Sequence, residues 1–370
     1  MSITFVPNLQ MMACVQTAIP ILNSPEIQKL INCYSLGCSE NIDMCNMIEK
    51  TATEKIQNLA LTSQLQAMVK DFLMNMFSEI IECKSNYSLF LTEWASHVNQ
   101  NFKFFWKSDG TIDQRKSVKS LIENEDVNVK ERFLLASNYC LIDASLSLWK
   151  TMTETQNIFS PLELECHRLA KFWIEIFKEE SSHSKISPQI LESSILQNNV
   201  HMLRYVMQML PYEKQRPYLL STTSKDDINA KVMIFCLSRL DECDQEKVFK
   251  NCPMKVLQCV LTWPYQYMFM NVANRLWAYL SKESFCDILW LILRKMMHQE
   301  WSDFRLIENL KEFWFECPAH FKEYAKQQSV FGLLIVILHC DMRYFPRCEL
   351  NQACIRSLEE FLHRICLNDL

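Results

Sequence analysis

The chain has 370 residues, 49% of them hydrophobic and 22% charged, with a net charge of −5 and only three glycines. Glycine-rich phosphate loops, dinucleotide fingerprints and the GxSxG nucleophile turn are excluded, because Gly37, Gly110 and Gly332 lie far apart and such loops need neighbouring glycines. The acidic balance gives no bulk attraction to nucleic acid or to an anionic membrane, so we expect neither as a partner.

The N-terminal residues are apolar but carry no basic region, and the first charge is Glu26. We therefore expect no signal peptide. Further along, apolar residues recur at three- and four-residue spacing and predict one amphipathic helix. This stripe comprises Ile56, Leu59, Leu61, Leu65, Met68, Val69, Phe72 and Leu73.

Residues 107–111, with the sequence KSDGT, predict the clearest turn of the chain. It separates an N-terminal helical segment, residues 1–108, from a longer helical array over residues 109–349. A second polar break follows at residues 180–187.

The tetrapeptide from Ser160 to Glu163 has the pattern of a helix start. Serine caps free N–H groups, proline suits the first turn, and glutamate at the third helical position completes a capping box. The helix that it opens should bury Leu169, Phe172, Trp173, Ile176 and Phe177, and should expose Lys171, Glu175 and Lys178.

Other helix boundaries are expected at polar or proline-containing positions. Residues 223–227 and Cys252-Pro253 predict starts, whereas Leu210-Pro211 and Trp263-Pro264 predict stops or sharp bends. The longest apolar stretch, residues 330–338, is too short to cross a bilayer. With almost no alternating strand patterns, the chain is predicted to be all-α.

Seventeen cysteines make up about 5% of the chain, below the roughly 8–10% of a disulfide scaffold. Their number is odd, and many lie in apolar helical runs, as Cys236 and Cys286 do. Free cysteine behaves there as a small buried hydrophobe. We therefore expect a reducing compartment, the cytoplasm or the nucleus.

No CxxC pair is present, since the closest cysteines, Cys33 and Cys38, are five residues apart. Four further cysteines follow a 7-9-7 spacing, but seven residues are two helical turns, about 10 Å, so we expect core thiols. These are Cys236, Cys243, Cys252 and Cys259. HExxH is also absent. We expect no metal, no cofactor and no catalysis; the alternative is a Cys/His-dependent enzyme or metal-binding protein on a helical scaffold.

Five tryptophans cluster in the C-terminal third of the chain. At helical spacing they favour packing between stacked helices, although an aromatic ligand groove is the alternative. They are Trp263, Trp277, Trp290, Trp301 and Trp314.

Several segments resemble degenerate ankyrin repeats. Residues 118–128 resemble the end of one repeat and the start of the next, residues 135–149 resemble its helix pair, and residues 197–206 resemble a second-helix entry. The glycine of the inter-helix turn is replaced by Cys140 and by Asn199, and no fixed 33-residue period runs through the chain. The resemblance implies an irregular α-solenoid of stacked antiparallel helix pairs.

The last segment, Ser357-Leu358 followed by a short amphipathic stretch, resembles the start of a suppressor-of-cytokine-signalling (SOCS) box. That pattern has a small residue, Leu, three free positions, Cys, three free positions and an aliphatic residue. The resemblance implies that Leu358 enters a pocket of elongin C, with Leu362 and Ile365 holding the same adaptor. Leu362 stands at the usual cysteine position and Cys366 at the aliphatic one. The sequence ends at Leu370, before the second part that the family uses to choose its cullin.

Two further observations bear on this resemblance. The same short pattern recurs at residues 161–170, and residues 350–370 also fit a helix that caps the array. The whole chain resembles a group of arthropod helical-repeat proteins, some with such a C-terminal box. We therefore expect a non-catalytic protein-interaction module, and the resemblance implies a substrate receptor of a cullin-RING ubiquitin ligase that binds elongin B and C.

Overall fold

The computed structural model describes residues 6–33, 41–91, 102–178, 199–298, 303–340 and Gln352. The chain divides into two compact units, which are described separately. The N-terminal unit comprises residues 6–44 and 50–236, and the C-terminal unit comprises residues 1–5, 45–49 and 237–370.

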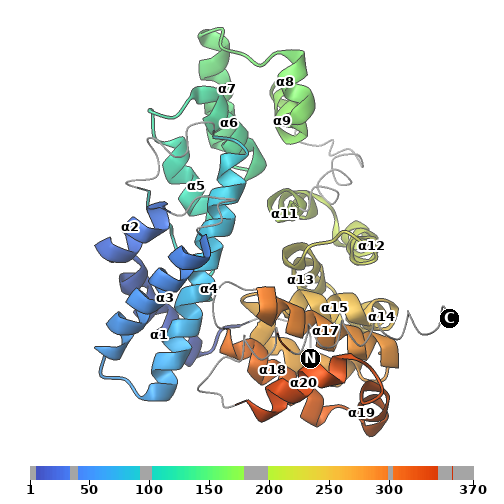
Figure 1. The fold of residues 1–370 in the computed structure, drawn as a ribbon. Coiled ribbons are helices and arrows are strands. Elements are labelled where there is room, and N and C mark those ends of the chain that lie inside the picture. Colours follow the sequence, from blue (N-terminus) through green and yellow to red (C-terminus); the bar gives the residue numbers. More distant parts are fainter. Residues whose placement is uncertain are drawn as a thin grey trace, which may run out of the picture. The chain divides into compact units, whose positions relative to one another are not determined.

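Every regular element within the described ranges is a helix, and the only extended pairing there is one bridge between Trp106 and Ile112 (Figure 1). The predicted all-α class is confirmed. Among the described helices, none combines the length and the apolar character needed to cross a lipid bilayer.

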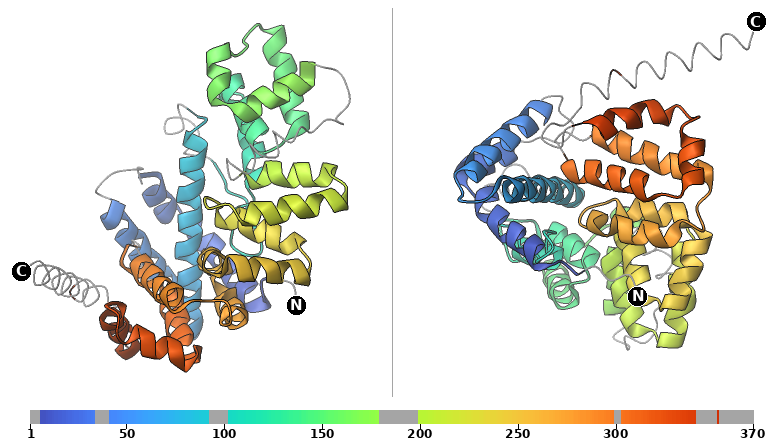
Figure 2. Two further views of the ribbon diagram at one scale, coloured as in Figure 1. Left: turned by 90° about the vertical axis from the view of Figure 1, so that its right-hand side faces the viewer. Right: turned by 90° about the horizontal axis from the view of Figure 1, so that it is seen from below.

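The longest described helix, α4 (Ser63–Ser88), forms the centre of the N-terminal unit (Figures 1 and 2). Its middle buries Phe72, Leu73 and Met76 completely, and α1 packs along it. The other helices are α1 (Leu9–Leu22), α2 (Pro25–Cys33), α3 (Asn41–Gln57) apart from residues 45–49, α5 (Gln114–Ile122), α6 (Val129–Asn138), α7 (Ile142–Glu154), α8 (Pro161–Cys166), α9 (Arg168–Lys178), α11 (Val200–Met209), α12 (Tyr212–Thr223) and the first part of α13 (Ala230–Arg239).

The apolar stripe over residues 56–73 is helical, but the prediction of a single helix is wrong. Helix α3 ends at Gln57 and α4 begins at Ser63. Between them, the Thr62 hydroxyl accepts a hydrogen bond from the Leu65 amide at 3.4 Å and so caps the new helix. The apolar spacing continues across this break, which is why periodicity did not indicate it.

The capping box at Ser160 is confirmed. The Ser160 hydroxyl accepts from the Glu163 amide at 3.3 Å, and Glu163 Oε2 accepts from the Ser160 amide at 2.6 Å. However, α8 ends at Cys166, because His167 leaves the helical conformation at φ −121° and ψ 64°, and α9 begins at Arg168. The described burial follows the prediction: Leu169, Phe172 and Trp173 are buried, Ile176 and Phe177 are half-buried, and Lys171, Glu175 and Lys178 are exposed.

Left-handed backbone occurs where glycine would be favoured. In the predicted turn, the Lys107 amide donates to the Thr111 carbonyl at 2.9 Å and Gly110 has φ 81°. Cys140 and Gln156 follow α6 and α7 with φ 52° and 54°, in the position that usually takes glycine after a helix. Asn199 is different: its φ is −85° and it caps α11, so its assignment as a glycine replacement is wrong.

The C-terminal unit is organised around α17 (Lys282–His298), which packs against four of its neighbours, α15, α18, α19 and α20. Its described helices besides α17 and the end of α13 are α14 (Glu242–Asn251), α15 (Pro253–Val260), the 3₁₀ helix η2 (Tyr265–Met268), α16 (Phe269–Leu276), α18 (Phe304–Glu316), α19 (Ala319–Ala325) and α20 (Val330–His339).

Most of the predicted boundaries hold. The start at Pro253 is confirmed, and helices end before Leu210-Pro211 and Trp263-Pro264. The predicted start over residues 223–227 is wrong, because α12 ends at Thr223 and α13 begins only at Ala230.

Aromatic rings fill much of the C-terminal core. Phe313 lies 4.9 Å from the Trp277 ring and 5.0 Å from Phe285, and Phe285 stacks on Phe321 at 4.9 Å between ring centroids. Trp314 is buried too. Packing between helices, as predicted, is confirmed for these two tryptophans, while Trp301 lies outside the described residues.

Candidate functional site

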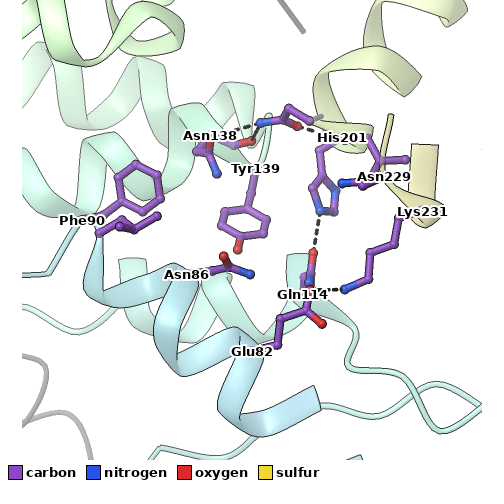
Figure 3. Close-up of a pocket in the computed structure, with 12 residues that line it drawn as sticks. Glu82, Asn86, Phe90, Gln114, Asn138, Tyr139, His201, Asn229 and Lys231 are labelled. Atoms are coloured by element: carbon purple, nitrogen blue, oxygen red, sulfur yellow. Dashed lines mark hydrogen bonds and ion pairs between the residues drawn. The ribbon is translucent and has the colours of Figure 1, made fainter. Parts of the chain in front are cut away.

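The C-terminal half of α4 carries Glu82 and Asn86 four residues apart on one helix face, and Phe90 lies in the turn that follows the helix. That face and the ends of α5, α6, α11 and α13 enclose a cavity of about 360 Å³ within the N-terminal unit (Figure 3). Its lining residues are Glu82, Asn86, Leu89, Phe90, Gln114, Asn138, Tyr139, Asn199, Val200, His201, Asn229 and Lys231.

Asn199 joins the end of α6 to the start of α11. Its Oδ1 accepts from the amides of His201 at 3.0 Å and Met202 at 2.9 Å, as an N-cap does. Its Nδ2 donates to the main-chain oxygen and to Oδ1 of Asn138, both at 3.0 Å. Asn199 is thus fully used by the fold. Within the described part of the chain, no group pairs with Nδ2 of Asn138, which keeps its two hydrogens for a ligand.

Asn86 is a further polar residue of the lining. Its half-buried side chain lies in the pocket beside Tyr139 and Phe90 (Figure 3). Among the described residues it makes no side-chain hydrogen bond. A primary amide donates through its nitrogen and accepts through its oxygen, so Asn86 offers both kinds of bond to a ligand.

His201 contributes a neutral imidazole. Its Nε2 lies 2.8 Å from Oε1 of Gln114, and Nε2 of Gln114 donates to Sγ of Cys83 at 3.8 Å. Because the Gln114 nitrogen is directed at sulfur, its oxygen accepts and Nε2 of His201 carries the hydrogen. Burial, helped by the charges of Arg204 and Arg115, lowers the pKa of His201 to about 3.

The charged groups at the base of the pocket satisfy one another. Lys231 Nζ lies 2.7 Å from Oε1 of Glu82 and 3.7 Å from Oε1 of Glu79. Burial raises the pKa of Glu79. Burial alone would lower the pKa of Lys231, but the two carboxylates outweigh it and hold the pKa above its usual value. Nearby, burial raises the pKa of Cys83 to about 12, so this thiol is not a nucleophile at neutral pH.

A second cavity of about 300 Å³ adjoins the first and shares Leu89, Phe90 and Asn138 with it. Part of its wall is apolar, formed by the buried residues Leu134, Leu169 and Ala170. Leu89 is 71% exposed, which is unusual for leucine and places it at the solvent edge of both cavities. The remaining lining residues are Cys166, His167 and Arg168.

Metal ligands are not assembled in the part of the chain that the structure describes: no group of three or more His, Cys, Asp or Glu there could hold an ion. The four cysteines with 7-9-7 spacing differ in burial. Cys236 and Cys259 are buried, as predicted, and Cys252 is half-buried, but Cys243 is exposed, so the prediction of a core thiol is wrong for Cys243.

The adaptor-binding residues expected from the SOCS-like pattern, Leu358, Leu362 and Ile365, lie outside the described residues. The internal copy of that pattern is interrupted. Leu162 is 74% exposed on α8, whereas Ala170 is buried on α9, beyond the break at His167. Residues 161–170 therefore do not form the single helix that the pattern requires.

Sequence reasoning did not find the pocket residues. One signal was available, because Glu82 and Asn86 stand four residues apart on a helix whose buried face is largely apolar. Asn138 and His201 carry no comparable signal, since their convergence with α4 is set by tertiary packing.

No family model matches the sequence, and no curated protein is significantly similar to it. The ankyrin-like and SOCS-like resemblances therefore rest on the short segments that carry them.

Proposed function

We propose that the chain is a non-catalytic protein-interaction module that holds part of a partner protein in the pocket beside α4. The observation that carries this proposal is the Asn86 amide, which has no hydrogen bond among the described residues although it is half-buried. Two other polar residues of the pocket, Asn199 and Lys231, are committed to the fold. A side-chain amide without a partner can pair with an amide of the ligand. Every protein presents such amides along its main chain.

The helical arrangement supports the same function. Helices α6 and α7 pack together and are joined by only three residues, which makes them an antiparallel hairpin. We propose that such pairs, over residues 109–349, form the irregular, degenerate ankyrin-like solenoid that the sequence suggests. Solenoids stack their repeats and expose long surfaces for partner chains.

The test is affinity purification of the full chain from its source cell, with partners identified by mass spectrometry. Asn86→Leu, which removes the free amide, should lose partners that the wild type recovers. Gln57→Leu makes the same exchange at an exposed position outside the pocket and should lose none. Circular dichroism melting checks that both variants fold. Equal recovery by all three proteins would contradict the proposal.

A second function is favoured by the C-terminal pattern alone. We propose that Leu358, Leu362 and Ile365 bind elongin C, which would make the chain a ubiquitin-ligase substrate receptor in the cytoplasm or nucleus. Co-purification with elongin B and C tests it. Leu358→Asp should abolish recovery of the adaptor, while Leu367→Asp, outside the pattern, should not. Equal recovery with Leu358→Asp would refute the receptor function.

A further inference from the structure

We infer that the ligand of this pocket is an extended peptide segment that runs along the end of α4, from Glu82 to Phe90 in the turn after the helix. Its main chain would pair with Asn86 and Asn138, and one aliphatic or aromatic side chain would enter the second cavity. This inference rests on the proposed function and specifies the form of the partner.

The hydrogen-bonding groups that remain available match a peptide unit. Each peptide unit presents one N–H and one C=O, and the Asn86 side chain accepts from the first and donates to the second. Asn138 adds a further donor, because its Oδ1 is taken by Asn199 but its Nδ2 is not engaged within the described part of the chain. Pairing between amides reads the main chain rather than any one side chain, so it holds an extended segment of varied sequence.

The dimensions agree with this pairing. Six helical residues separate Glu82 from Ser88, the last residue of α4, which is about 9 Å along the helix axis, and Phe90 lies in the turn that follows. An extended chain advances about 3.3 Å per residue, so about three residues span the helical part of this path. The segment then reaches Phe90 and Leu89, where the second cavity begins.

The second cavity gives the segment a preferred side chain. Its buried wall of Leu134, Leu169 and Ala170 is apolar, and Phe90 separates it from the polar cavity. Leu89, now largely exposed, would be covered by an incoming apolar side chain. Removing such surface from water is favourable by about 25 cal/mol for each Å².

The charges of the first cavity disfavour a phosphorylated ligand. Lys231, the cation that lines the first cavity, already contacts Glu82 and Glu79. Glu82 also presents its carboxylate to the cavity, where it would repel a phosphate. A neutral main chain carries no such penalty.

The experiment selects binders for the immobilised full chain from a phage library of random dodecapeptides. Selected peptides are synthesised and their affinities are measured by fluorescence polarisation. The wild type is compared with Asn86→Leu, with Asn86→Asp, which keeps the shape but loses the donor, with Leu89→Asp, and with the control Gln57→Leu. Each peptide is also made with single N-methyl groups, which remove one main-chain N–H at a time.

We expect the selected peptides to share one aliphatic or aromatic position. Both Asn86 variants and Leu89→Asp should weaken binding about tenfold, and Gln57→Leu should not change it. One N-methyl group should weaken binding to the wild type about tenfold but have no further effect on Asn86→Leu, because the same bond is already lost.

Three outcomes overturn the inference. The first is binding insensitive to every N-methyl group, and the second is a selection dominated by charged side chains. The third is that no peptide binds while Asn86→Leu still loses protein partners. In that case the proposed function stands, but the inference of an extended segment fails. If neither peptides nor protein partners depend on Asn86, the proposed function fails as well.

Discussion

The ammonium of Lys231 lies 2.7 Å from the carboxylate of Glu82, a residue 149 positions earlier in the chain, and so ties the start of α13 to α4. The same ammonium is 3.7 Å from Glu79, whose side chain is only 6% exposed. Glu82 has water as an alternative partner, since its side chain is 52% exposed. Glu79 has little access to water and depends on the lysine for its ionised form.

Replacing Lys231 by methionine should therefore destabilise the protein through Glu79. A buried charge left without its partner costs about 3 kcal/mol, whereas Glu82→Gln removes a half-exposed pair and should cost less than about 1 kcal/mol. Urea unfolding at pH 7 measures both. The loss of unfolding free energy caused by Lys231→Met should be smaller at pH 5, because the raised pKa of Glu79 favours the neutral acid there. Equal losses in the two variants would contradict the assignment.

His201 should make stability fall on acidification. Its pKa is lowered to about 3 by burial, against about 6.5 when unfolded. As the pH falls below 6.5 the unfolded state gains a proton that the folded state does not, so stability declines until the pH reaches about 3. Between pH 8 and pH 4.5 this single group should account for a loss of about 2.5 kcal/mol.

The comparison for this prediction is His201→Gln, which cannot titrate. Urea unfolding of both proteins across this pH range should show a smaller acid loss in the variant, by about 2.5 kcal/mol. If the unfolding free energy of the two proteins falls equally with decreasing pH, His201 is not protected from protonation.

Asn199 has two roles that a matched pair of variants separates. Asn8 caps α1 with one bond to the Met11 amide at 2.8 Å, whereas Asn199 caps α11 and also holds Asn138. Loss of a cap costs about 1 kcal/mol, and a lost bond between helices adds about as much again. Asn199→Ala should therefore lose about 2 kcal/mol and Asn8→Ala about 1 kcal/mol in urea unfolding. Equal losses would mean that the bond to Asn138 contributes nothing.

Gln156→Gly should stabilise the chain. Gln156 is exposed and has φ 54°, a conformation that strains any residue with a Cβ. Glycine relieves that strain but adds freedom to the unfolded state, so the expected net gain is about 0.5–1 kcal/mol. Thr155→Gly is the control, since Thr155 has φ −87° and should only lose stability. A loss in both variants, measured by urea unfolding, would rule out relief of strain.

Local signals predicted much of the fold. The capping box at Ser160 and the proline at position 253 act on the nearest helical turn, so their effects can be read from a few residues. The breaks at residues 58–62 and at His167 could not be read in this way. Apolar spacing continues through both and so does not mark where each helix ends.

The pocket residues could not be predicted from the local sequence either, for a related reason. Asn86, Asn138 and His201 come from three helices and meet only once the unit is folded. A single asparagine on a helix has the same sequence context whether it faces solvent or a cavity. Asn199 shows this difficulty most directly. It stands where an ankyrin-like repeat would have glycine, which suggested a turn residue, but its side chain caps α11.

Thiol reactivity should separate the described cysteines by burial. Burial raises the pKa values of Cys83, Cys140 and Cys236 to about 12, which leaves almost no thiolate at pH 7.5. Cys33, Cys166 and Cys243 are exposed. Iodoacetamide should therefore label these three first, and peptide mass spectrometry should find the three buried thiols labelled only in denaturant.

The same labelling also reports on the second cavity. Cys166 lines that cavity, whereas Cys243 lies on α14 in the other unit. A peptide whose apolar side chain fills the cavity should slow the labelling of Cys166 and leave the rate at Cys243 unchanged. Equal slowing at both cysteines would point to a general effect of the peptide, and no slowing at a saturating concentration would place its side chain elsewhere.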